Sequence, residues 1–162
     1  MVTVSDKTET AQLYELLSSV VDPEIPVLTL QDLGVLRDIS LIDGEVNVTI
    51  TPTYAGCPAM ETMRSDIEST LATAGYERVS VKQSLSPAWS TDWMSADGRE
   101  KLREYGIAPP AKTACGKSAT QIECPQCQSA EVDLISEFGS TACKALYQCR
   151  DCREPFDYFK CI

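Results

Sequence analysis

The sequence predicts an α+β protein: a small two-layer sandwich of helices on a three-stranded sheet, followed by a C-terminal zinc-ribbon module. Three observations predict this architecture. Apolar residues recur at helical spacing near the start and again after residue 58. Between them, two alternating segments flank an Asp-Gly pair. Seven of the eight cysteines fall in the last third of the 162 residues and include two C-x-x-C pairs.

The first domain begins with a predicted helix, which the segment DPEIP at residues 22–26 ends, because proline lacks an N–H and biases its predecessor away from helix. Two strands are predicted at residues 35–42 and 45–51, joined by Asp43-Gly44 as a type I′ hairpin turn. The apolar face of the helix consists of Leu13, Leu16, Leu17, Val20 and Val21.

A second helix is predicted after Cys57-Pro58, with Gly75 at its C-terminal end. Residues 77–85 form a third predicted strand, and residues 86–105 add an extension with Trp89, Trp93 and a short helix that Ser95 caps. Helices covering one face of such a sheet are typical of an α+β sandwich. The buried face of the second helix consists of Met60, Met63, Ile67 and Leu71.

A Pro109-Pro110 pair followed by small polar residues indicates a linker. We therefore predict a first domain at residues 1–108, a linker at 109–122 and a cysteine-rich module at 123–162. In that module, three predicted strands form a meander that carries two cysteine knuckles. These strands are residues 130–138, 141–149 and 155–161.

Composition excludes several classes of function. The chain has no histidine, so it cannot supply a Cys–His dyad, a histidine metal ligand or the Glu-x-x-His pairs of ferritin-like di-iron sites. A net charge of −10 disfavours nucleic acid as a partner. There is no apolar run long enough for a membrane and no signal-peptide pattern, so we expect a cytoplasmic protein. In a reducing cytosol, clustered cysteines favour metal or redox chemistry over disulfides.

Two C-x-x-C pairs separated by 21 residues predict a four-thiolate structural zinc site. About 40 residues bury too little surface to fold securely, whereas structural zinc contributes on the order of 10 kcal/mol. An iron–sulfur centre or a redox-active C-x-x-C are the alternatives, and Cys115 in the linker is incidental. Gln128 and Arg153 follow the knuckles where glycine is common. The predicted ligands are Cys124, Cys127, Cys149 and Cys152, with Cys143 and Cys161 as alternates.

Cys57 and a pair of acidic residues are the candidate functional groups of the first domain. As a helix N-cap before Pro58, the Cys57 sulfur would face unpaired backbone N–H groups, which lower a thiol pKa. The alternative is a small buried apolar residue. Asp22 and Glu24 could bind metal or act as acids or bases, but a structural role in the loop is favoured.

The segments DPEIPVLTLQDLGVLRDI and TPTYAGCPAM resemble the small domain of SufT-like iron–sulfur assembly proteins over roughly residues 10–85. PAWSTDWM and the tail, above all FGSTACKALYQC and CREPFDYFK, are similar to the PaaD (also called PaaJ) family of bacterial phenylacetate degradation. That similarity covers nearly the whole chain. It places the family's functional positions on Asp22, Glu24, Thr51, Thr53 and Cys57 and its metal-binding tail on the four knuckle cysteines.

The resemblance implies a non-enzymatic accessory protein of phenylacetyl-CoA epoxidase, a multicomponent di-iron monooxygenase, that assists iron or iron–sulfur cofactor assembly. Expected partners are the epoxidase components, especially an iron–sulfur reductase, and other iron–sulfur assembly proteins. A chain without histidine is not expected to be the oxygenating subunit. The alternatives are a stably bound structural or electron-transfer subunit and a thiol redox protein.

A transient iron–sulfur cluster is a further expectation, beside the structural zinc. A cluster needs about four ligands, and the first domain offers one cysteine, Cys57. The others would come from a second protomer in a homodimer, from small thiols or from the client protein. Incomplete ligation makes a cluster labile, which suits transfer rather than storage.

Overall fold

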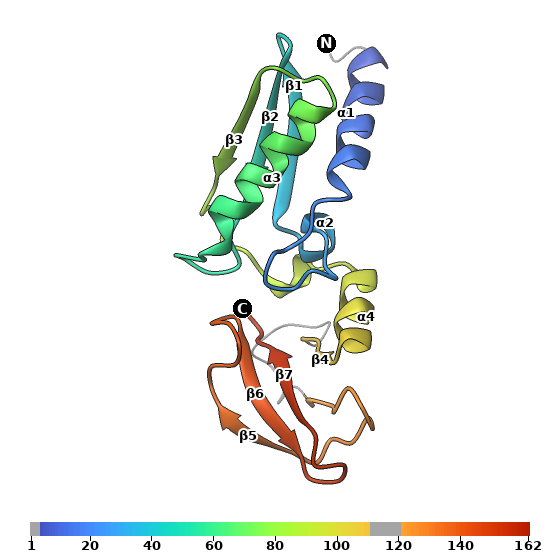
Figure 1. Cartoon of the computed structure of the whole chain (residues 1–162), viewed down its shortest axis with the longest axis vertical. Helices are drawn as coiled ribbons and strands as arrows, with labels where there is room; N and C mark the ends of the chain where they lie inside the picture. The colour runs from blue at the N-terminus through green and yellow to red at the C-terminus, as the bar shows by residue number, and fades with distance from the viewer. Residues whose placement is uncertain (1–3, 111–120) are drawn as a thin grey trace. The chain divides into compact units, whose positions relative to one another are not determined.

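A computed structural model describes residues 4–110 and 121–162 (Figure 1). The chain divides into two compact units, Met1–Trp89 and Ser90–Ile162. The chain combines helices and strands, so the expected α+β class is confirmed. Within the described residues, no helix is long and apolar enough to cross a membrane.

The first unit is a three-stranded sheet with two long helices. Strands β1 and β2 are antiparallel, while β3 runs parallel to β2, with α3 as the crossover between them. Helices α1 and α3 contact each other and the sheet, and they cover one of its faces (Figure 1). The elements are α1 (Val4–Leu17), α2 (Leu30–Leu33), β1 (Leu36–Ile42), β2 (Glu45–Ile50), α3 (Ala59–Thr73) and β3 (Val79–Gln83).

The alternating pattern of the sequence forms this core. The turn between β1 and β2 has φ of 50° at Asp43 and 74° at Gly44, which is the left-handed geometry of the expected type I′ hairpin. Gly75, just beyond α3, has φ of 97° and occupies the expected C-terminal position. The apolar side of β2 and most of the predicted helix faces are buried together, whereas Leu16 of the predicted α1 face is only partly buried. The buried residues are Leu13, Leu17, Val46, Val48, Ile50, Met60, Met63, Ile67 and Leu71.

The structure differs from the sequence prediction between α1 and β1. Helix α1 ends at Leu17, so Val20 and Val21 lie in the following segment. The short helix α2 was not predicted, because a single turn shows no apolar period. Its start is a capping box, in which Thr29 Oγ1 accepts from Asp32 N–H (3.0 Å) and Asp32 Oδ2 accepts from Thr29 N–H (3.2 Å).

The second unit is a four-stranded sheet in the order β4-β7-β6-β5. Its β5-β6-β7 meander is antiparallel, as expected, whereas the two-residue strand β4 pairs parallel to β7 and is too short to predict from a pattern. Arg99 donates to Thr91 O (2.6 Å) within the same unit. The elements are η1 (Thr91–Trp93), α4 (Ala96–Tyr105), β4 (Ile107–Ala108), β5 (Val132–Ser136), β6 (Lys144–Cys149) and β7 (Pro155–Phe159).

The segment 90–108, which the sequence groups with the first domain, belongs to the second compact unit. Ser95 caps α4 as expected, because its Oγ accepts from Gly98 N–H at 2.9 Å. Trp89, by contrast, belongs to the first unit and donates its indole N–H to Leu33 O at 3.0 Å.

Candidate functional site

The first candidate site is a cluster of four cysteines in the second unit. Cys124 and Cys149 are buried, and Cys127 and Cys152 are exposed. Their sulfur atoms all lie within 4.8 Å of one another. The Sγ–Sγ distance is 3.7 Å between Cys124 and Cys152 and 3.5 Å between Cys127 and Cys149.

This geometry fits one tetrahedral ion. With Zn–S bonds of about 2.3 Å, the sulfurs of a tetrahedral site lie about 3.8 Å apart. In an iron–sulfur cluster, the four cysteines are divided among two or more iron atoms, so sulfurs bound to different irons lie further apart than those of a mononuclear site. The spacing of the four sulfurs and their soft thiolate chemistry therefore support binding of a single metal ion, for which zinc is the common choice.

Each knuckle closes in the same way. Cys124 N–H donates to Ser129 O (2.9 Å) in the first, and Cys149 N–H donates to Glu154 O (3.0 Å) in the second. The residue after the second cysteine has a left-handed backbone in both, with φ of 64° at Gln128 and 66° at Arg153. The knuckles therefore keep the turn that glycine usually makes, at a cost of about 1–2 kcal/mol for each residue.

Backbone donors surround the sulfur of Cys149. The N–H of Cys152 donates to it, with a further contribution from the N–H of Asp151, and these donors lower the pKa of Cys149 to about 7. A thiolate is the form that binds metal, so Cys149 is the cysteine of this knuckle that loses its proton more readily, whereas burial and the neighbouring cysteines raise the pKa of Cys152 to about 12.

The other cysteines of this unit lie outside the cluster. Cys143 begins the chain segment that enters β6, with its Sγ 3.0 Å from Thr141 Oγ1. Cys161 Sγ lies 3.7 Å from Thr91 Oγ1 and is disulfide-bonded, contrary to the expectation that cysteines here serve only metal or redox chemistry. Cys115 lies outside the described residues.

Cys57 lies in the loop between β2 and α3 of the first unit. Pro58 is the N-cap of α3, so Cys57 precedes the cap rather than forming it. The loop is held by Cys57 N–H donating to Tyr54 O (3.3 Å) and by Met60 N–H donating to Cys57 O (3.4 Å). The thiol is half-buried.

The expected low pKa of Cys57 is wrong. Burial raises the pKa of this thiol, and the carboxylates of Glu24 and Asp22 raise it further. The Ala59 N–H at the start of α3 lowers it, as does the Tyr54 side chain, but these donors are outweighed. At neutral pH, Cys57 is therefore a protonated thiol beside two negative charges.

Asp22 and Glu24 have different roles in the loop after α1. Asp22 is buried, and its Oδ1 accepts from the N–H of Glu24 (2.7 Å) and of Ile25 (3.1 Å). This Asx turn is the structural role that the sequence favours. Glu24 is partly exposed and has the larger electrostatic effect on Cys57.

The two threonines lie on the path from β2 to Cys57. Thr51 and Thr53 are both buried, and Thr51 N–H donates to Val35 O at 2.9 Å. Tyr54, whose side chain hydrogen-bonds to Cys57, was missed by the sequence reasoning. Its position three residues before the cysteine, in the same short loop, was the available signal.

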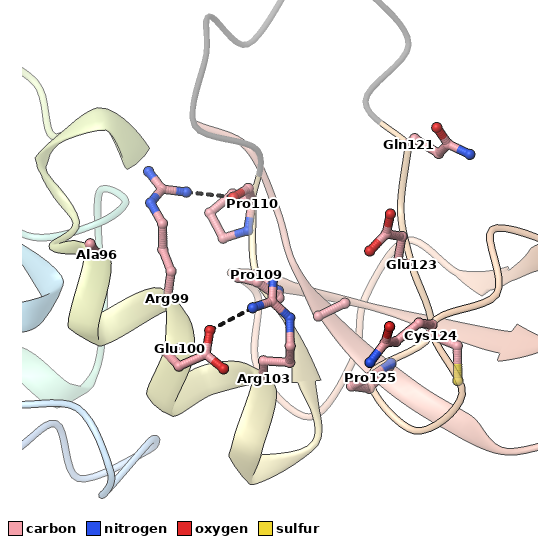
Figure 2. Close-up of a pocket in the computed structure, with 12 residues that line it drawn as sticks. Ala96, Arg99, Glu100, Arg103, Pro109, Pro110, Gln121, Glu123, Cys124 and Pro125 are labelled. Atoms are coloured by element: carbon pink, nitrogen blue, oxygen red, sulfur yellow. Dashed lines mark hydrogen bonds and ion pairs between the residues drawn. The ribbon is translucent and has the colours of Figure 1, made fainter.

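A polar cavity of about 330 Å³ lies between α4 and the first knuckle (Figure 2). Arg99 and Arg103 both line it, but each guanidinium already has protein partners. Arg99 donates to the backbone oxygen of Pro110, and Arg103 contacts Glu100 at 2.6 Å (Figure 2). The two arginines that line the cavity are therefore explained by contacts within the protein.

Comparisons with known proteins match the two units separately. Residues 10–82 match a family described as iron-sulfur cluster assembly protein, and residues 108–160 match one described as PaaD zinc beta ribbon domain. A protein of Escherichia coli (strain K12), named as a putative subunit of 1,2-phenylacetyl-CoA epoxidase, is 53% identical over 152 residues, covering 93% of this chain and 92% of that protein. The chain belongs to the PaaD family.

Two further relatives of this family member match the first unit. A Porphyromonas gingivalis protein named "Fe-S protein maturation auxiliary factor" is 33% identical over 92 residues, which is 56% of this chain and 87% of that protein. The crystal structure of a DUF59 domain from Bacillus anthracis has a TM-score of 0.57 and 28% identity, covering 60% of this chain and 94% of that chain.

Proposed function

We propose that the chain is a non-catalytic accessory factor that assists assembly of the iron–sulfur or iron cofactors of phenylacetyl-CoA epoxidase. The observation that carries this proposal is the half-buried Cys57 thiol beside Glu24 and Asp22, in a unit of the iron–sulfur assembly family. The similarity to a protein named as an epoxidase subunit supports the choice of client. An iron–sulfur component, such as a reductase, is the client class that needs this chemistry.

The electrostatics around Cys57 suit a transient metal cargo. Glu24 and Asp22 disfavour the free thiolate, but the same charges attract an incoming iron cation. Metal binding then requires loss of the thiol proton, so affinity rises with pH. Cys57 supplies one ligand, so the other ligands of the iron cargo come from the client, from small thiols or from Cys57 of a second protomer. A cargo with so few ligands from this chain transfers readily.

Buried Thr51 and Thr53 hold the segment that carries Cys57. In this proposal they position the loop rather than bind the cargo, because both lie inside the unit. The four knuckle cysteines hold structural zinc, which closes the second unit without redox chemistry.

The name of the E. coli relative favours one alternative, a stably bound epoxidase subunit. That alternative predicts stoichiometric co-purification with the oxygenase, whereas an assembly factor acts in less than stoichiometric amounts. A thiol redox enzyme that uses Cys57 is disfavoured, because a nucleophilic cysteine needs a lowered pKa and that of Cys57 is raised.

The test is cofactor loading of the epoxidase components in cells that produce Cys57→Ala or Cys57→Ser in place of the unmodified chain. Iron content and visible absorption of the purified reductase component are measured, with Cys143→Ala as the matched cysteine control. We expect loading to fall several-fold with both Cys57 variants and to stay normal with the control. Normal loading with Cys57→Ala would contradict the proposal.

A further inference from the structure

The two cysteine knuckles are tied together by a hydrogen bond between side chains that are not ligands. Ser129 follows the first knuckle, and Asp151 lies inside the second. Ser129 Oγ donates to Asp151 Oδ2 at 2.6 Å, across 22 positions of sequence. The same Ser129 Oγ accepts from Glu131 N–H at 3.1 Å, which fixes its orientation.

Both residues of this pair also contact ligand sulfurs through their backbones. Ser129 N–H donates to the sulfur of Cys127, and Asp151 N–H donates to the sulfur of Cys149. Ser129 O accepts from Cys124 N–H at 2.9 Å. A continuous path therefore runs from one ligand sulfur through Ser129 and Asp151 to a ligand sulfur of the other knuckle.

We propose that the Ser129–Asp151 hydrogen bond is a positioning contact that holds the two knuckles at metal-binding separation and slows the release of zinc. This inference rests on the zinc site proposed above. The two sulfurs that the path joins lie 3.5 Å apart, close to the tetrahedral edge of about 3.8 Å. Without the contact, the two knuckles are held together less tightly and a sulfur leaves the ion more often.

The size of the effect follows from the other ties between the same segments. Loss of a hydrogen-bond partner that orients metal ligands typically costs 10–100-fold in affinity. Here the second knuckle has additional ties to β5 and the residue before it, because Arg150 N–H donates to Glu131 O (2.8 Å) and Arg150 Nε donates to Asp133 Oδ2 (2.9 Å). We therefore expect loss of the contact to speed zinc release by an amount near the lower limit of that range, about tenfold.

The test measures transfer of zinc from the purified full-length chain to a chelating dye. Ser129→Ala should release zinc about tenfold faster than the unmodified chain. Asp151→Asn keeps an acceptor oxygen and should release zinc at nearly the original rate. The double variant Ser129→Ala/Asp151→Ala should be no faster than Asp151→Ala, because the two changes remove one contact.

Ser140→Ala is the matched control, because Ser140 Oγ donates to Asp157 Oδ2 (2.8 Å) in an equally exposed Ser–Asp pair away from the knuckles. Unchanged release from Ser129→Ala would overturn the inference, as would equal acceleration by Ser140→Ala, which would indicate a general loss of stability. Zinc content of the unmodified chain separates the two proposals. If the unmodified chain holds one zinc and Ser129→Ala releases it no faster, only the positioning contact is refuted. If the unmodified chain holds no zinc, the zinc site itself is refuted.

Discussion

Glu24→Gln should make Cys57 more acidic and therefore more reactive at neutral pH. Among the two acidic neighbours, Glu24 raises the pKa of Cys57 more than Asp22 does. It is also the cleaner site for substitution. Asp22 Oδ1 accepts hydrogen bonds from two backbone N–H groups. Glu24 takes part in that turn through its backbone N–H. Glutamine removes the charge and keeps the length of the side chain.

The expected magnitude is modest, because burial is the largest cause of the raised pKa and the substitution leaves it in place. A partly exposed charge pair is worth about 0.2–1 kcal/mol, which corresponds to a 1.4- to 5-fold larger thiolate population. A more acidic thiolate is also a weaker nucleophile, with a Brønsted coefficient of about 0.4–0.5. The alkylation rate should therefore rise by only about 1.2- to 2.5-fold.

The assay is pulsed iodoacetamide labelling between pH 6.5 and 10, with the Cys57 peptide quantified by mass spectrometry. Labelling of the unmodified chain should rise with pH and reach half its maximum above the pKa of an ordinary cysteine, because burial and both carboxylates disfavour the thiolate. In Glu24→Gln the half-maximum should move to lower pH.

Glu77→Gln is the charge-matched control, because Glu77 is exposed and lies beyond the opposite end of α3 from Cys57. If Glu24→Gln labels no faster than Glu77→Gln at pH 7.5, Glu24 does not act on the thiol as argued. A half-maximum for the unmodified chain below that of a free cysteine would refute the raised pKa itself.

The remaining predictions concern the second unit. Cys149→Ser, which removes a buried ligand, should leave the purified chain without stoichiometric zinc by elemental analysis, whereas Cys143→Ser should retain it. Gly139→Ala should destabilise the unit by about 1–3 kcal/mol in urea unfolding. The reason is that the new Cβ would clash with Asp157 Oδ1, in the carboxylate that pairs with buried Lys144, and unchanged stability would refute this close approach. Arg99→Met should cost about 1–3 kcal/mol, because the carbonyls of Thr91 and Pro110 lose a donor; a circular-dichroism melt identical to that of the unmodified chain would contradict it.

Local patterns in the sequence were enough to predict much of the fold. Alternation in β2 and the Asp43-Gly44 turn specify a hairpin because both signals depend on neighbouring residues. The paired cysteines were recognisable for the same reason, since the C-x-x-C spacing lets two sulfurs reach one ion. Strand β4 and helix α2 were missed, because elements of two and four residues carry no periodic signal.

What the sequence by itself determined about this protein is therefore its chemistry: a chain without histidine, a single cysteine before Pro58 and four cysteines in two pairs. The tertiary structure decided how those groups behave. Burial of Cys57 reverses the expected direction of its pKa, and Glu24 adds to that effect through space, because Coulomb energy depends on the distance between charges and not on their separation in sequence. Likewise, no motif in the sequence pairs Ser129 with Asp151, and the folded ribbon brings their side-chain oxygens to 2.6 Å.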